Sequence, residues 1–135
     1  MVRQRTIEPG TLFGHLRIER ELGSGAFATV YLARDTLLDR RVALKVIPVA
    51  GIDENTAERE RILAEARHVA QLNSPNIVAL FGVRIFPQLD AWVFELEYVD
   101  GGTLGALLSD AAPLEPRRVF AVFRGIVEAL RVAHE

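Results

Sequence analysis

The sequence predicts an α+β fold in which a five-stranded antiparallel sheet with one inserted helix is followed by helices. Before Asp100, apolar residues recur at every second position in several short runs, a spacing typical of half-buried strands. Short turn-forming stretches connect the first three runs, which favours an antiparallel meander. Helical spacing replaces the two-residue repeat between the third and fourth runs, and again after Gly102.

Five segments are predicted as strands, each bounded by residues that favour turns. Pro87 to Asp90 forms the predicted hairpin between the last two strands. The predicted strands span residues 16–22, 27–34, 41–49, 77–86 and 91–99. The first predicted helix is therefore inserted between the third and the fourth strand.

This first helix begins at a capping box formed by Asn55 and Glu58 and ends near Leu72. Its apolar positions form one stripe, and Glu65 lies immediately beside that stripe rather than opposite it. The members of the stripe are Ile62, Ala66, Val69 and Ala70.

Two further helices are predicted at residues 103–109 and about 117–134. The second is apolar over most of its circumference, so it requires burial on several sides. The 135 residues leave too little chain to cover it, and its pattern reaches Glu135 without a stop signal. We therefore expect the chain to be the front part of a larger domain.

Composition excludes several classes of protein. Half of the residues are hydrophobic, which allows a core, and a net charge of −2 without a basic stripe argues against nucleic-acid binding. The absence of cysteine excludes disulfides and thiolate metal sites, and His15, His68 and His134 lack metal-binding spacing. The sequence contains no signal peptide and no membrane segment, so we expect a cytoplasmic location for this part of the protein.

A glycine pair and a lysine indicate a nucleotide site. Gly23 and Gly25 lie between two strands, where glycine lets backbone N–H groups approach phosphate closely. On the third strand Ala43 and Lys45 share one face, which suits an aromatic base beside a polyphosphate. A Rossmann turn would require a helix directly after the glycines, whereas residues 29–32 have the pattern of a strand.

These residues also carry a family resemblance. The pattern Gly23-x-Gly25-x-x-Ala28-x-Val30, followed by Val42-Ala43-Leu44-Lys45, resembles the glycine-rich loop and third-strand lysine of protein kinases, with alanine at the third glycine position. Residues 74–78 resemble the kinase turn between helix and fourth strand, and residues 97–104 resemble the hinge between the two kinase lobes. Over residues 12–135 the sequence is most similar to bacterial Ser/Thr protein kinases.

The resemblance implies the following roles. Backbone N–H groups of residues 24–28 would cover the phosphates of ATP, and Lys45 would contact the α- and β-phosphates while pairing with Glu65. Lys45 and Glu65 are therefore the candidate catalytic residues of this chain. Val69 and Leu80 would belong to the apolar column that links the two lobes.

The adenine ring would lie between Val30 and Ala43, with Leu96 behind it and the main chain of Glu97 and Val99 at its edge. The full set of candidate nucleotide-binding residues is Leu22, Gly23, Ser24, Gly25, Ala26, Phe27, Ala28, Val30, Ala43, Lys45, Leu96, Glu97 and Val99.

The first residues are polar and end in Pro9-Gly10, so they are interpreted as a loose leader (1–11). The resemblance divides the rest of the chain into a small lobe that binds ATP (12–99) and the hinge exit with the first two large-lobe helices (100–135). Neither a His-Arg-Asp nor an Asp-Phe-Gly motif occurs, so the catalytic loop and the Mg²⁺ ligands are expected outside this chain. The chain alone is expected to be inactive. The complete protein would transfer the γ-phosphate of ATP to Ser or Thr of a protein substrate, and could carry a membrane anchor elsewhere.

Two alternatives from other functional classes remain at this point. The parent could be a pseudokinase or an ATP-binding regulatory module without phosphotransfer, with Ala28 as the hint. The chain could instead be an interaction domain whose apolar last helix docks a partner. At the level of single residues, Lys45 could be an exposed strand lysine and Glu65 a solvated helix carboxylate.

Overall fold

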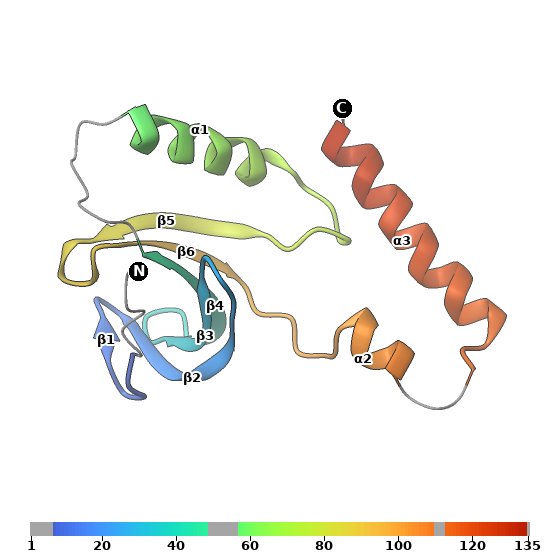
Figure 1. The fold of residues 1–135 in the computed structure, drawn as a ribbon, viewed down its shortest axis with the longest axis horizontal. Coiled ribbons are helices and arrows are strands. Elements are labelled where there is room, and N and C mark those ends of the chain that lie inside the picture. The colour runs from blue at the N-terminus through green and yellow to red at the C-terminus, as the bar shows by residue number, and fades with distance from the viewer. Residues whose placement is uncertain (1–6, 49–56, 110–112, 135) are drawn as a thin grey trace. The chain divides into compact units, whose positions relative to one another are not determined.

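The computed structural model describes residues 7–48, 57–109 and 113–134 (Figure 1). The chain divides into two compact units. The first comprises the described residues up to Gln71 together with Ala79–Tyr98, and the second comprises Leu72–Val78 and the described residues from Val99 onward.

The first unit is built on a six-stranded antiparallel sheet with the strand order β1-β2-β3-β4-β6-β5. The strands are β1 (Leu12–Phe13), β2 (Leu16–Ser24), β3 (Thr29–Asp35), β4 (Arg40–Pro48), β5 (Leu80–Phe86) and β6 (Ala91–Glu97). The sheet curls, with β1 to β4 forming its most strongly bent part (Figure 1). The predicted meander of the first three long strands is therefore present as β2, β3 and β4.

Strand β4 lies inside the sheet, because it pairs with β3 on one side and with β6 on the other. Val42, Leu44 and Val46 point into the hydrophobic core inside the curl. Ala43 and Lys45 alternate with them and therefore point to the opposite face. The members of the core are Ile7, Phe13, Leu16, Ile18, Tyr31, Ala33, Val42, Leu44, Val46, Ala91 and Val93.

The sheet has one strand more than predicted, and the segment before it is packed rather than loose. Ile7 is buried in the core, and its backbone N–H donates a hydrogen bond to the Tyr31 hydroxyl at 3.3 Å. Phe13 in β1 packs edge-on against Phe86 at 5.0 Å between ring centroids. The expectation of a loose leader through residue 11 is thus wrong for Ile7, because burial of its side chain fixes this segment against the sheet.

Two strands are shorter than predicted where turns take over. Ile77 donates its N–H to the Ser74 carbonyl at 3.1 Å, so β5 begins at Leu80 instead of residue 77. Strand β6 ends at Glu97, and Val99 accepts a hydrogen bond from the Gly101 N–H at 3.1 Å in a turn beyond it. The predicted hairpin between β5 and β6 is present, and Pro87–Leu89 form a single 3₁₀ turn (η1) within its loop.

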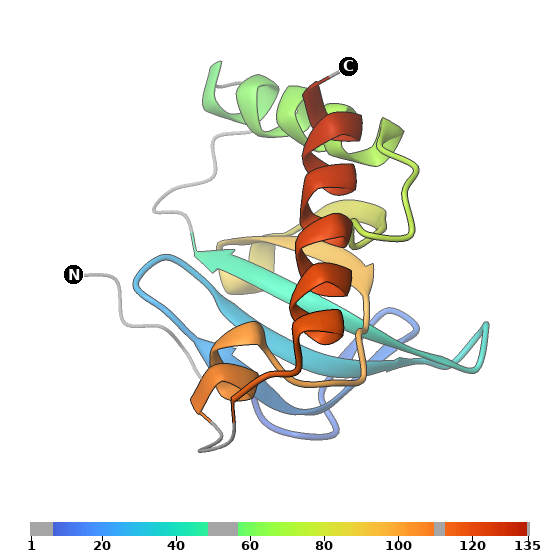
Figure 2. The same ribbon diagram turned by 90° about the vertical axis from the view of Figure 1, so that its right-hand side faces the viewer.

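Helix α1 (Ala57–Gln71) lies alongside β5 in both ribbon views (Figures 1 and 2). The predicted capping box at Asn55 lies outside the described residues. Ala66, from the predicted apolar stripe, is buried, whereas Glu65 next to it is exposed. The helix thus covers the sheet face opposite the core, the face to which Lys45 points.

The second unit contains α2 (Leu104–Ser109) and α3 (Pro116–His134). The Thr103 hydroxyl accepts a hydrogen bond from the Ala106 N–H at 3.0 Å and so caps α2. No residue of α3 between Pro116 and His134 is buried. Its exposed apolar side chains include Phe120 at 76% and Phe123 at 62% exposure. Among the described residues, no helix is both long and apolar enough to span a membrane.

We predict that the exposed apolar side chains of α3 make this chain self-associate, because a continuous apolar surface in water favours contact with another such surface. Replacing Phe120 and Phe123 together with serine should shift the chain toward the monomer in sedimentation-velocity runs across a concentration series. Arg124→Ser is the matched control on the same helix and should leave the distribution unchanged. A wild-type chain that stays monomeric at high concentration would contradict this prediction.

The turn between β3 and β4 is organised by a buried carboxylate. One oxygen of Asp35 accepts hydrogen bonds from the N–H groups of Leu37 and Leu38, each at 3.0 Å. The Leu38 hydrogen bond is the largest cause that lowers the pKa of Asp35, and desolvation opposes it. The Leu37 hydrogen bond and the charges of His15 and Arg40 lower the pKa further.

We predict that Asp35 makes stability depend on pH in acid. Because its folded pKa is lowered, its contribution is complete above the ordinary value of 3.8 and is lost as the pH falls through the lower folded pKa. Asp35→Asn should lower the urea midpoint at pH 7 and flatten the fall of that midpoint below pH 3.8. Asp39→Asn changes an exposed carboxylate in the same turn and should do neither; equal acid profiles of wild type and Asp35→Asn would refute the assignment.

Candidate functional site

The strand register gathers four of the candidate residues on one face of the sheet. Val30 on β3 lies opposite Lys45 on β4, and Ala43 on β4 lies opposite Leu96 on β6. Directly opposite residues on antiparallel strands point to the same face. Ala43 is buried, Val30 and Leu96 are half-buried, and Lys45 is exposed. A small apolar floor therefore lies beside one cation, as the sequence predicts.

The glycine turn follows directly from this register. Ser24 pairs with Thr29, and the Gly25 N–H donates to the Ala28 carbonyl at 2.9 Å, which closes the turn. A Cβ atom added to Gly23 would meet no atom within 4 Å, and neither Gly23 nor Gly25 has a positive φ. The backbone of the turn therefore does not require glycine at these two positions. Phe27 at its tip is 86% exposed.

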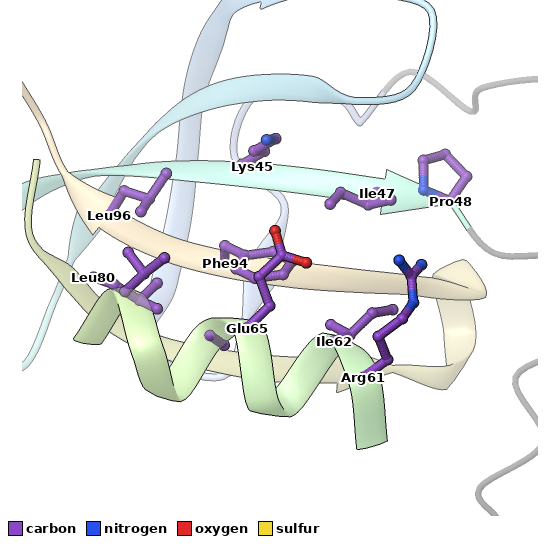
Figure 3. A pocket seen from close by; sticks show the side chains of 11 residues that line it. Lys45, Ile47, Pro48, Arg61, Ile62, Glu65, Leu80, Phe94 and Leu96 are labelled. Carbon is purple, nitrogen blue, oxygen red and sulfur yellow. The ribbon is translucent and has the colours of Figure 1, made fainter. Parts of the chain in front are cut away.

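Lys45 and Glu65 line the same cavity without contacting each other. The cavity has a volume of about 400 Å³ and lies between α1 and strands β4, β5 and β6. Glu65 reaches from α1 toward the sheet, and Lys45 lies on β4 across the cavity (Figure 3). Among the described residues neither of the two side chains has an ion-pair partner. The structure thus brings the two residues together on one cavity but does not show the pairing that the resemblance implies.

The walls of this cavity are mainly apolar and include both members of the predicted apolar column. Val69 and Leu80 line it, and Leu80 lies opposite Leu96 on the neighbouring strand. The complete lining is Lys45, Ile47, Pro48, Arg61, Ile62, Glu65, Ala66, Val69, Leu80, Phe94 and Leu96. The three charged residues of this lining, Lys45, Arg61 and Glu65, are all exposed, so the apolar side chains form the wall and the charges lie where solvent reaches them.

Three residues of this cavity are not among the predicted site residues, although their spacing from predicted ones indicates the same face. Ile47 is two residues after Lys45 on β4, and Phe94 is two residues before Leu96 on β6, so each shares its neighbour's face. Arg61 is one helical turn before Glu65, which places both on the same side of α1 (Figure 3). Arg61 adds a second cation to the cavity wall.

The end of β6 is held by its neighbour. Glu97 donates its N–H to the Ala79 carbonyl at 2.9 Å, and its carboxylate accepts a hydrogen bond from the Ala79 N–H at 3.2 Å. In the second unit Val99 is 59% exposed. The two hydrogen bonds with Ala79 fix the main chain of Glu97 on the side of β5.

Chemically, this site offers N–H groups of a glycine turn, one strand cation, an apolar floor and one carboxylate. These groups suit binding of an anionic ligand with an apolar ring. In the part of the chain that the structure describes, no cluster of three or more His, Asp or Glu side chains is arranged to hold a metal ion.

Comparison with known proteins decides the family. The family model of the protein kinase domain matches residues 16–135, nearly the whole chain. The chain belongs to the protein kinase family. The kinase chain is 34% identical over 122 residues to the serine/threonine-protein kinase PrkC of Bacillus subtilis, covering 90% of the chain and 18% of PrkC. It is 37% identical over 126 residues to PknD of Mycobacterium tuberculosis, covering 93% of the chain and 18% of PknD.

Solved structures show the same fold. The kinase domain of Mycobacterium tuberculosis PknI superimposes with a TM-score of 0.77 at 28% identity, over 96% of this chain and 51% of that chain. The kinase chain therefore spans about a fifth of the length of its curated relatives and about half of a solved kinase domain. The predicted α+β fold and the resemblance to bacterial Ser/Thr protein kinases are confirmed.

Proposed function

We propose that this chain is the ATP-binding part of a Ser/Thr protein kinase that transfers the γ-phosphate of ATP to protein substrates. The observation that carries the proposal is the shared face of Val30, Ala43, Lys45 and Leu96 next to the glycine turn. This arrangement offers one place for a flat apolar base and, beside it, one cation for phosphate. Similarity to named serine/threonine-protein kinases supports the same assignment.

The phosphates would lie under the glycine turn. The Gly25 N–H already donates to Ala28, so the remaining N–H groups of residues 24–28 are the donors proposed for phosphate oxygens. Lys45 would contact the α- and β-phosphates as a charge-assisted donor. Because a Cβ atom added to Gly23 would meet no atom within 4 Å, the phosphate chain has room to approach the backbone there.

Glu65 is proposed to hold Lys45 in place when nucleotide is bound. The two side chains line one cavity without touching, so the ion pair requires their approach across it. A bound triphosphate beside Lys45 would fix the lysine, and a fixed lysine then favours a single position for the Glu65 carboxylate. We therefore assign Lys45 to phosphate binding and Glu65 to positioning of Lys45.

The adenine ring is proposed to pack on Val30 and Ala43 with Leu22 and Leu96 at its margins. Main-chain groups of Glu97 and Val99 would hydrogen-bond its edge. The strand position of Glu97, held by Ala79, supports this assignment because a recognition edge must be rigid to select one base.

For the complete protein we propose the usual requirements of phosphoryl transfer. ATP and Mg²⁺ would be needed, the Mg²⁺ ligands would come from outside this chain, and the acceptor would be a Ser or Thr hydroxyl of a protein. The small lobe would correspond to residues 12–99 and the start of the large lobe to residues 100–135. The weak net charge of −2 argues against a nucleic-acid partner, and ATP use supports a cytoplasmic location.

We predict that Lys45→Met abolishes most ATP binding while leaving the fold intact. Loss of one charge-assisted phosphate contact should weaken ATP binding about 10- to 100-fold in calorimetric titrations. The free energy of unfolding should change by less than about 0.5 kcal/mol, since Lys45 is exposed and has no ion-pair partner among the described residues. Arg67→Met, an exposed cation on α1 outside the cavity, is the matched control.

The outcomes of this experiment separate the candidate functions. A wild-type chain that binds no ATP, or a Lys45→Met chain that binds as well as wild type, would refute the nucleotide site. Steady phosphate transfer by the wild-type chain alone, lost in Lys45→Met, would refute the proposal that the catalytic loop and the Mg²⁺ ligands lie outside this chain.

We predict that Gly25→Ala weakens ATP binding without destabilising the protein. The new methyl group would lie 3.8 Å from the Ala28 carbonyl oxygen, an ordinary contact, and the backbone φ is compatible with alanine. A more restricted unfolded chain should even raise stability by up to about 1 kcal/mol. In the complex the same methyl would obstruct the phosphates, so the dissociation constant should rise while the urea midpoint does not fall. A lower urea midpoint would show that the glycine is structural.

A further inference from the structure

A bulge in β5 turns Leu80 toward the cavity. Leu80 pairs with Leu96 and Gly82 pairs with Glu95, so two steps on β5 match one step on β6, and Phe81 is the additional residue. Gly82 and Phe86 are related by strict alternation, and Phe86 packs on the core face. Without the additional residue, Leu80 would point to the core face as well, because a shift of one residue reverses the side-chain direction.

The bulge residue Phe81 stacks on the charged side chain of Arg40, the first residue of β4. The guanidinium carbon of Arg40 lies 4.0 Å from the centroid of the Phe81 ring, within the range of a cation–π contact. The same guanidinium is 3.5 Å from a Glu95 carboxylate oxygen and, through Nε, 3.5 Å from Asp35. Arg40 thus connects the β3–β4 turn, the bulge and strand β6.

Glu95 is the buried carboxylate that Arg40 contacts on β6. Its side chain is only 8% exposed, and Arg84 approaches its second oxygen at 3.9 Å. The position facing it is Gly82, where an added Cβ would lie 4.0 Å from that oxygen. A buried carboxylate is unfavourable without a close cation, and removal of Arg40 would leave Glu95 only the longer contact with Arg84, which favours reorientation of Glu95 at the bulge.

The bulge also lies next to the part of β6 assigned to adenine. Ala79, directly before Leu80, exchanges two hydrogen bonds with Glu97, at 2.9 and 3.2 Å. A change of register at Phe81 would therefore displace both the cavity wall at Leu80 and the support of Glu97.

We propose that Arg40 is a positioning residue that locks the β5 bulge through Phe81 and Glu95, and so sets Leu80 and Glu97 at the nucleotide site. The restraint of the bulge by Arg40 does not depend on ATP, whereas its effect on ATP binding rests on the proposed function. Arg40 lies on the sheet face opposite Lys45 and acts only through these neighbours.

Amide hydrogen exchange of the ¹⁵N-labelled chain tests the lock without any nucleotide. In Arg40→Met, the Ala79 and Glu97 amides should exchange about tenfold faster relative to the Ile18 amide, which is bonded to Thr11 at 2.9 Å outside the bulge. Arg34→Met removes a cation from the neighbouring strand, where it pairs with exposed Asp39 at 2.6 Å, and should leave these ratios unchanged.

An equal increase at Ile18 would indicate general destabilisation and would overturn the proposal, as would no increase at Ala79 and Glu97. If Arg40→Met does not fold, Phe81→Leu replaces it, because Phe81 is 43% exposed and leucine keeps an apolar side chain without the ring. The same local increase is expected there, and its absence in a folded Phe81→Leu chain overturns the proposal.

Titrations with ATP and with inorganic triphosphate then test the link to the nucleotide site. Arg40→Met should weaken ATP binding and leave triphosphate binding unchanged, whereas Lys45→Met should weaken both. A wild-type chain that binds neither ligand would refute the proposed function. The hydrogen-exchange result would still show whether Arg40 restrains the bulge. Equal weakening of both ligands by Arg40→Met would overturn the link to adenine.

Discussion

The pairing of β4 with a strand on each side is the constraint on which the rest of this structure depends. Because β4 is paired on both sides, its alternation divides the sheet into a core face, with Leu44, and a site face, with Lys45. A shift of β4 by one residue would bury the lysine among the core side chains and remove the cation from the site. The curled core, the glycine turn and the cavity under α1 all take their positions from this single strand.

Much of the fold could be predicted from the sequence because its determinants are local. Alternating apolar residues place β2, β3, β4 and β6 within a few residues of their observed bounds, and turn residues give their order. Burial of Ile7 was not predictable in this way, since one isoleucine in a polar stretch carries no periodicity and its partner Tyr31 is far along the chain. Nor was the bulge at Phe81, because an extra residue is recognisable only against the strand that it faces.

The candidate site could be predicted in part, for the same reason. Residues that share a strand, such as Ala43 and Lys45, have their common face fixed by the two-residue repeat. The separation of Lys45 and Glu65 depends instead on where α1 packs, which no local pattern specifies. Contacts between long side chains of different strands, such as Arg40 with Glu95, likewise depend on the tertiary arrangement. From the sequence alone, a charged residue in a strand is predicted to be exposed.

The bulge has a further consequence for how this sheet meets other chains. Strand β5 is an edge strand, and an open edge with regular hydrogen-bonding groups invites a second strand to add to it and start aggregation. An extra residue at Phe81 interrupts the regular spacing of those groups, and the charge of Arg84 further along the same strand makes a dry interface unfavourable. The irregularity that orients Leu80 therefore also acts as protection against amyloid-like strand addition at this edge.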